Sequence, residues 1–309
     1  MSAGTRRVAG IDCGTNSIRL LIAEVDADGR LHDLVRRMEI VRLGEGVDDT
    51  GRLSAAALER TRFALEEYTS QIREHGVEAV RMAATSASRD AENAGEFTAM
   101  VESVLGLAPE VISGDEEARL SFTGAIATLP GLDGQRLLVD IGGGSTEFVR
   151  GRGSEVLAAA SVDIGCVRMT ERHLRSDPPT GAETAAAVAD IRAAADRALA
   201  GVDPDRAAAE LVAVAGTATT VAAIALDLPA YDAEAIDGAR ITYEQVAKVT
   251  SDLAGTDREQ RLAIPVMHPG RADVIFGGAL VLRTIMERSG AESVLVSEHD
   301  ILDGIALSA

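Results

Sequence analysis

The sequence contains almost no lysine. Lys248 is the only lysine among 309 residues, so the remaining positive side chains are arginines. A P-loop nucleotidase needs a lysine that follows a glycine and precedes Ser or Thr, whereas Lys248 stands between Ala247 and Val249. The sequence therefore excludes a P-loop enzyme and leaves arginine as the abundant cation for binding phosphate.

Aromatic residues, cysteines and long apolar runs are also scarce. Aromatic residues make up 3% of the chain, tryptophan is absent, and the net charge is −19. Nucleic-acid and anionic-membrane surfaces attract basic, often aromatic-rich proteins, so neither is expected as a partner. No apolar run reaches the roughly 18–20 residues that span a bilayer, and the five histidines lack zinc-site spacing. Cys13 and Cys166 are expected to be buried thiols of a cytoplasmic protein.

What remains is a globular α/β pattern. Hydrophobic residues make up 46% of the chain and charged residues 26%, and this length suggests two domains at about 150 residues each. Apolar strands are predicted at residues 8–13, 18–25 and 31–41, followed by a helix capped by Ser54. The second half repeats the opening, with strands predicted at residues 136–141, 145–150 and 155–164.

One short motif occurs twice. Residues 12–17 and 140–145 share the spacing Asp-x-Gly-x-x-Ser, and each copy joins two apolar strands. A second echo places a polar turn after a strand at residues 83–86 and again at 213–217. The repeats predict two similar domains that face each other across a cleft, residues 1–126 and 127–309, with the boundary inside 125–134.

The repeated glycine turns predict phosphate-binding loops. Glycine lets successive backbone N–H groups point at one anion, so such a loop binds phosphate without lysine. The candidate phosphate ligands in the two loops are Gly14, Thr15, Asn16, Ser17, Gly142, Gly143, Gly144 and Ser145. The carboxylates that precede the loops, Asp12 and Asp140, would repel phosphate unless a divalent cation lies between them. A single copy could equally be an ordinary hairpin turn, and the matched pair favours function.

Other polar residues near expected turns can be interpreted in two ways, as functional or as purely structural. Three carboxylates begin a predicted helix: Asp115, Glu116 and Glu117. Either all three interact with the positive end of the helix dipole, or one of them acts as a general base. Three arginines follow turns as phosphate ligands or as surface residues: Arg89, Arg168 and Arg271. Gly216 and Thr217, at another predicted helix start, are either a third anion contact or a simple cap.

Taken in order, these segments resemble the exopolyphosphatase/guanosine pentaphosphate phosphohydrolase (Ppx/GppA) family of the actin/sugar kinase/Hsp70 ATPase superfamily. The segments that carry the resemblance are residues 10–17, 84–91, 112–120, 139–147, 164–168, 215–220 and 271–273. The resemblance implies two ribonuclease H-like (actin-like ATPase) domains, each a mixed sheet flanked by helices. It also implies that the last helix, about residues 300–309, packs back on the first domain.

The resemblance implies a phosphoanhydride hydrolase. The expected reaction is release of terminal orthophosphate from inorganic polyphosphate, with guanosine pentaphosphate as the alternative substrate. Glu117 matches the family's general base and Arg89 its cleft arginine. Asp140 and Glu147 match acidic positions near a Mg²⁺ or Mn²⁺ ion, and Asp12 is a further candidate ligand. A monovalent cation and a homodimer are additional expectations.

The sequence departs from the family pattern in two places. Long members carry a further helical region, resembling an HD-type domain, after the position of Ala309, so short chains are the expected substrate here. Asp300 stands where a glycine is usual. The competing hypotheses are a non-catalytic sensor of polyphosphate or nucleotide and a sugar or acetate kinase, which the segment around Glu117 disfavours.

Overall fold

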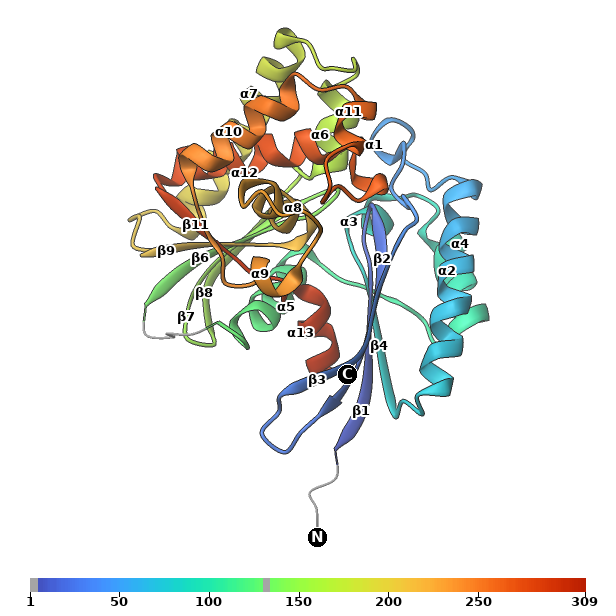
Figure 1. Cartoon of the computed structure of the whole chain (residues 1–309). Helices are drawn as coiled ribbons and strands as arrows, with labels where there is room; N and C mark the ends of the chain where they lie inside the picture. Colours follow the sequence, from blue (N-terminus) through green and yellow to red (C-terminus); the bar gives the residue numbers. More distant parts are fainter. Residues whose placement is uncertain (1–4, 130–133) are drawn as a thin grey trace. The chain divides into compact units, whose positions relative to one another are not determined.

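The computed structural model describes residues 5–129 and 134–309. They form two compact units: unit 1 comprises Met1–Ala127 and Asp300–Ala309, and unit 2 comprises Thr128–His299 (Figure 1). The end of the chain therefore belongs with the N-terminal half rather than with the segment that precedes it. Residues 130–133, part of the stretch where the boundary was expected, lie outside the described residues.

Unit 1 contains a five-stranded mixed sheet in the order β3-β2-β1-β4-β5. Its strands are β1 (Arg6–Cys13), β2 (Ser17–Val25), β3 (Leu31–Ile40), β4 (Ala79–Ala84) and β5 (Glu110–Val111). Its helices are α1 (Val47–Thr50), α2 (Ala55–Glu74), α3 (Ser86–Asp90), α4 (Ala94–Leu105), α5 (Gly114–Ile126) and α13 (Ile301–Leu307). β2 runs antiparallel to β1 and β3, whereas β4 is parallel to β1.

Helix α2 covers one face of this sheet, with α4 beside it (Figure 1). Ser54 caps α2 by accepting an N–H of its first turn, as the sequence predicts. Leu65, Tyr68 and Ile72 form the buried stripe, and the Tyr68 hydroxyl donates to the Ile18 carbonyl at 3.0 Å. These contacts fix β2, and with it the turn that precedes β2.

Two glycines bring α5 and α13 into backbone contact. A Cβ atom on Gly124 would lie 1.8 Å from the Asp300 carbonyl oxygen, and one on Gly304 would lie 2.1 Å from the Leu120 carbonyl oxygen. On its other side, α13 buries Leu302 and Ala306 against residues of β1 and β2. The terminal helix is thus part of the core of unit 1.

Unit 2 contains a six-stranded mixed sheet in the order β10-β11-β9-β6-β7-β8. Its strands are β6 (Gln135–Ile141), β7 (Thr146–Arg152), β8 (Glu155–Val162), β9 (Glu210–Val214), β10 (Arg240–Thr242) and β11 (Ser293–Val296). Its α-helices are α6 (Cys166–His173), α7 (Gly181–Val202), α8 (Ala215–Ala225), α9 (Ala233–Ile236), α10 (Tyr243–Ala254), α11 (Arg258–Leu262) and α12 (Ile275–Ser289). A 3₁₀ turn, Pro269–Arg271, precedes α12.

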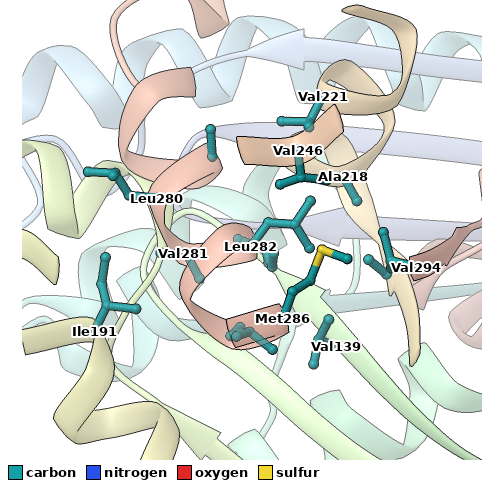
Figure 2. Packing of buried hydrophobic residues seen from close by; sticks show 14 of the residues in the cluster. Val139, Ile191, Ala218, Val221, Val246, Leu280, Val281, Leu282, Met286 and Val294 are labelled. Atoms are coloured by element: carbon teal, nitrogen blue, oxygen red, sulfur yellow. The ribbon is translucent and has the colours of Figure 1, made fainter. Parts of the chain in front are cut away.

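Helix α12 lies at the centre of the unit 2 core. Apolar residues surround nearly its whole circumference, which is typical of a helix buried on all sides. Figure 2 shows Leu282 and Met286 of this helix among Val139 of β6, Val294 of β11 and Val246 of α10. This core holds the ends of β6 and β9, from which the functional loops leave.

The two units share one topology. In unit 2, strands β8-β7-β6-β9-β11 repeat the order and directions of β3-β2-β1-β4-β5 in unit 1, with β10 added at the edge. This is the ribonuclease H-like arrangement, so the predicted α/β class with two mixed sheets flanked by helices is confirmed. The sequence did not predict β10, because three residues are too short to show a strand period.

Helix length alone does not indicate a membrane span here. Helix α2 has 20 residues and α7 has 22, but charged side chains interrupt both. Across residues 5–129 and 134–309, no helix is both long and apolar enough to cross a bilayer.

Replacing Gly304 with alanine tests the contact between α5 and α13. The added methyl group would overlap the Leu120 carbonyl, so G304A should lower the free energy of unfolding by about 1–3 kcal/mol. Urea denaturation followed by circular dichroism measures the change. G95A in α4 is the control, because a Cβ there meets no atom within 4 Å, and it should raise stability by up to about 1 kcal/mol. Equal midpoints for the two variants would contradict the close contact.

Candidate active site

The first predicted loop, residues 14–17, joins β1 to β2 in unit 1. Two of its carbonyl groups accept backbone hydrogen bonds from residues 41–44. Thr15 O accepts the Gly44 N–H, and Asn16 O accepts the N–H groups of Val41 and Arg42, at 2.9–3.1 Å. Within the described part of the chain, the N–H groups of Thr15 and Asn16 donate no backbone hydrogen bond outside helices and strands. With its carbonyls fixed in this way, the loop has the polarity of an anion-binding nest.

The Thr15 side chain connects this loop to the next turn. Thr15 Oγ1 and Ser86 Oγ form a buried hydrogen bond at 2.9 Å, and Thr85 N donates to the Cys13 carbonyl. Ser86 begins α3, and the same short helix carries Arg89. The sequence reasoning missed Ser86, although its place in the strand–polar turn echo was a usable signal.

Of the three carboxylates that begin α5, only Glu117 is buried. Glu116 pairs with Arg81 at 2.7 Å, and Asp115 pairs with Arg119 at 3.3 Å, both near the surface. The Ser113 hydroxyl caps the helix and sets its first turn. Two members of the acidic cluster thus form surface ion pairs, and Glu117 is the member that is buried.

The structure brings Glu117 and Arg89 together. Arg89 Nη1 donates to Glu117 Oε2 at 3.2 Å and to the Ile112 carbonyl at 2.9 Å. The side chain of Glu117 is 10% exposed and that of Arg89 is 27% exposed, so the pair is held by the fold yet open on one side. A carboxylate in this setting can accept a proton, and the adjacent guanidinium can contact an anion.

Asp12 has a protein cation as its partner. Arg19 Nε and Nη2 donate to Asp12 Oδ2 at 2.9 and 2.7 Å, and Arg19 Nη1 donates to Asp300 Oδ2. Burial raises the pKa of Asp12, and the Arg19 guanidinium opposes that rise. Asp300 also caps α13 by accepting the Leu302 N–H. The unusual residue at position 300 therefore anchors the last helix to β2 through Arg19, which the sequence reasoning did not single out.

The second predicted loop, residues 142–145, joins β6 to β7 in unit 2 and is also tied by its carbonyls. Gly142, Gly143 and Gly144 accept the N–H groups of residues 165–168, at 2.9–3.1 Å. Arg168 Nε adds a 2.8 Å bond to the Gly144 carbonyl, so this arginine braces the loop. Over the described ranges, the N–H groups of Gly143, Gly144 and Ser145 make no backbone hydrogen bond, and the buried Ser145 hydroxyl has no partner.

Asp140 and Glu147 form a pair of buried carboxylates. They are direct cross-strand partners in the β6–β7 ladder, and the Cβ atoms of such partners lie on the same face of the sheet about 5 Å apart. Ser161 Oγ donates to Glu147 Oε1 at 2.7 Å and orients that carboxylate. Among the residues that the structure describes, no three His, Cys, Asp or Glu side chains form a cage for a metal. Two carboxylates nevertheless fit Mg²⁺, which commonly takes one or two carboxylates together with water and phosphate oxygens.

The third candidate contact lies at the start of α8. Gly216 allows Arg271 to lie against this turn, since a Cβ on Gly216 would be 2.2 Å from Arg271 Nη2. Arg271 Nη1 donates to Thr220 Oγ1 at 3.0 Å. Ala215 has a left-handed φ of 67°, so the turn from β9 into α8 is strained. The structure thus brings Gly216 and Arg271 together, and Thr217 follows Gly216 in α8.

Tyr231 is a residue of this region that the sequence reasoning missed. Its hydroxyl lies 2.8 Å from Thr219 Oγ1 and 2.5 Å from Glu298 Oε1, while the residue is 43% exposed. Burial of the phenol and the neighbouring Glu298 carboxylate raise the pKa of Tyr231, so the hydroxyl stays protonated at neutral pH. A tyrosine in a chain with few aromatic residues was the signal available in the sequence.

The predicted residues thus gather in two groups, one in each unit. In unit 1 the group consists of the first loop, Asp12, Arg89 and Glu117; in unit 2 it consists of the second loop, Asp140, Glu147, Arg168, Gly216, Thr217 and Arg271. Cys13 and Cys166 are free and buried, as expected. Burial raises the pKa of both thiols, so neither is a reactive thiolate.

Replacing Gly165 with alanine tests whether the carbonyl-side contacts shape the second loop. A Cβ at this position would lie 2.2 Å from the Gly143 carbonyl group, so the loop backbone must move. G165A should weaken binding of pyrophosphate by about tenfold or more, measured by titration calorimetry. G181A in α7 is the control, because nothing lies within 4 Å of a Cβ there, and it should bind like the original chain. Unchanged affinity in G165A would contradict an anion-binding role for this loop.

This chain is similar to several known proteins over nearly its whole length. Exopolyphosphatase 2 of Mycobacterium tuberculosis is 52% identical to this chain over 98% of both chains. The crystal structure of a Ppx/GppA family member from Aquifex aeolicus has a TM-score of 0.83 at 33% identity, covering 99% of this chain and 97% of that chain. That of an exopolyphosphatase from Cytophaga hutchinsonii has a TM-score of 0.89 at 27% identity, covering 97% and 96%.

The family model gives the same result. It is described as the Ppx/GppA phosphatase family, and it matches residues 21–309, nearly the whole chain. The second loop, Glu117 and the sheet of unit 2 lie within these residues, whereas the first loop, residues 14–17, precedes them. The chain belongs to the Ppx/GppA phosphatase family.

Proposed function

We propose that this chain is an exopolyphosphatase, a phosphoanhydride hydrolase that releases terminal orthophosphate from inorganic polyphosphate. One observation carries the proposal. In both glycine loops the carbonyl groups accept hydrogen bonds from neighbouring backbone, so the N–H groups of the loops remain to bind an anion. The substrate class is supported by the 52% identity to a mycobacterial protein named exopolyphosphatase.

Phosphate binding in this proposal uses backbone N–H groups and arginine. The N–H groups of residues 143–145 and the Ser145 hydroxyl bind phosphoryl oxygens in unit 2, with Arg271 at the start of α8 as a further ligand. Thr15 and Asn16 provide the equivalent N–H groups in unit 1. Lys248, the one lysine, takes no part, since it lies on α10 and pairs with Asp252.

Glu117 is the proposed general base. Its carboxylate is held in the first turn of α5 and contacts Arg89 on one oxygen, Oε2. A carboxylate fixed in this way orients a water molecule and removes its proton during attack on phosphorus. Arg89 then lies next to the developing negative charge, which a guanidinium stabilises through short-range hydrogen bonds.

Asp140 and Glu147 are the proposed ligands of a divalent cation, Mg²⁺ or Mn²⁺. When bound, such an ion would neutralise phosphoryl charge and polarise the phosphorus–oxygen bonds. Asp12 was a third candidate, but its Oδ2 atom already accepts two hydrogen bonds from the Arg19 guanidinium. We therefore assign the metal to the cross-strand pair, while Asp12 orients Arg19.

The proposal also covers the location of the protein, its oligomeric state and its substrate. A cytoplasmic location and a homodimer follow from the family resemblance. Guanosine pentaphosphate is the competing substrate, and parallel kinetics on it and on polyphosphates of defined length would rank the two. Tight binding without phosphate release would instead indicate a sensor.

Glu117→Gln tests the general base. E117Q keeps the shape of the side chain but removes its basicity, so phosphate release from polyphosphate should fall by about 10²–10⁴-fold with the fold intact. E116Q, one residue away and paired with Arg81, is the matched control and should keep nearly full activity. A malachite green assay measures release, and circular dichroism checks folding. Similar rates for both variants would remove Glu117 from the mechanism.

Glu147→Gln tests the cation site. In the original chain, MgCl₂ should raise the melting temperature, because a ligand that binds only the folded state stabilises it. E147Q should lose most of this rise and need about tenfold or more Mg²⁺ for half-maximal phosphate release. The control E155Q, at the exposed start of β8, should behave like the original chain. An unchanged Mg²⁺ response in E147Q would place the ion elsewhere.

A further inference from the structure

The first loop is held by a segment that shows strain of its own. Residues 41–44 donate three backbone N–H groups to the carbonyls of Thr15 and Asn16. Arg42 in this segment has a left-handed φ of 48°, which is uncommon for a residue other than glycine, asparagine or aspartate. A segment in such a conformation keeps its shape only where surrounding contacts hold it.

Residues 41–44 also pack closely against the first loop. A Cβ on Gly44 would lie 2.4 Å from Thr15 Cγ2, so the segment and the loop meet with no spare space. The same Thr15 hydroxyl is bonded to Ser86 Oγ. A small displacement of residues 41–44 would therefore move both the backbone and the side chain of Thr15.

One arginine binds the carbonyl groups of residues 41 and 42, whereas the N–H groups of these residues bind the first loop. Arg60, on α2, donates from Nε to the Val41 carbonyl at 2.7 Å and from Nη2 to the Arg42 carbonyl at 3.3 Å. Nη2 also contacts Glu45 Oε2 at 2.9 Å. The planar guanidinium thus binds two successive carbonyls and a carboxylate, a geometry that the single ammonium of lysine does not reproduce.

We propose that Arg60 is a positioning residue for phosphate binding by the first loop. It acts through residues 41–44, whose N–H groups fix the Thr15 and Asn16 carbonyls and so aim the N–H groups of that loop. Arg168 has the corresponding task in unit 2, where it bonds directly to Gly144. The inference deepens the proposed function and rests on it for the identity of the anion.

R60A, R60K and R62A form a matched set for the test. Arg62 lies on the same helix but pairs with Glu59 and Glu66, so R62A removes an arginine from α2 without affecting the first loop. R60A should raise the KM for polyphosphate about tenfold and change kcat by less than about twofold, because loop positioning affects binding of ground state and transition state alike. R60K should give an intermediate KM, and R62A should match the original chain.

Two outcomes of the kinetics would overturn the inference. Equal KM values for R60A and R62A would do so. A lower melting temperature and lower kcat with unchanged KM in R60A would also do so, because Arg60 would then only support the fold. If R60A does not fold, R60K and R60Q replace it, with KM expected to rise from R60K to R60Q.

A binding measurement separates this inference from the proposed function. Titration calorimetry with tripolyphosphate on the full-length variants needs no turnover. Weaker binding by R60A than by R62A supports the inference even if the original chain hydrolyses no polyphosphate, which would contradict the proposed function alone. Equal affinities together with hydrolysis by the original chain would contradict the positioning role alone.

Discussion

The proposed phosphate-binding site depends on hydrogen bonds that the two glycine loops make through their carbonyl groups. Each loop gives its carbonyls to a neighbouring segment, residues 41–44 in unit 1 and residues 165–168 in unit 2. A peptide loop whose carbonyls all point into the protein turns its N–H groups toward the other side. The supporting segments differ, a strained turn in one unit and a helix start in the other, yet they impose the same polarity on the loop.

The repeated strand pairs differ in charge at one equivalent position. Asp12 faces Arg19 across β1 and β2, and Asp140 faces Glu147 across β6 and β7, in the same ladder positions. In unit 1 the protein supplies the cation that neutralises the aspartate. In unit 2 the partner is a second carboxylate, and two buried carboxylates are stable together when a cation or a proton is shared between them. Under the proposed function, the carboxylate pair of unit 2 would hold the divalent cation, whereas Asp12 of unit 1 is bonded to Arg19.

Much of the fold and of the candidate site could be predicted from the sequence, because the patterns that indicate them are local. The glycine loops, the strands on either side of them and the Ser113-capped helix of Glu117 are each encoded within a few residues. Arg60, Arg19 and Ser86 were not predicted, because their roles depend on contacts with residues far away in the sequence. Arg19 and Asp300 are 281 positions apart, and Thr15 and Ser86 are 71 apart. The family resemblance assigned Glu117, whereas the geometry explains why Glu116 beside it is only a surface partner.

The net charge of −19 constrains how such a chain can bind a polyanion. Many arginines are already paired with carboxylates, such as Arg81 with Glu110 and Glu116, so they add little positive field at a distance. Attraction must then act at hydrogen-bond range, where oriented N–H groups and a guanidinium meet phosphoryl oxygens directly. Affinity in this regime depends on the position of a few donors more than on the number of cations. Under the proposed function, residues that hold a loop in place, such as Arg60 and Arg168, therefore contribute to recognition of the polyanion.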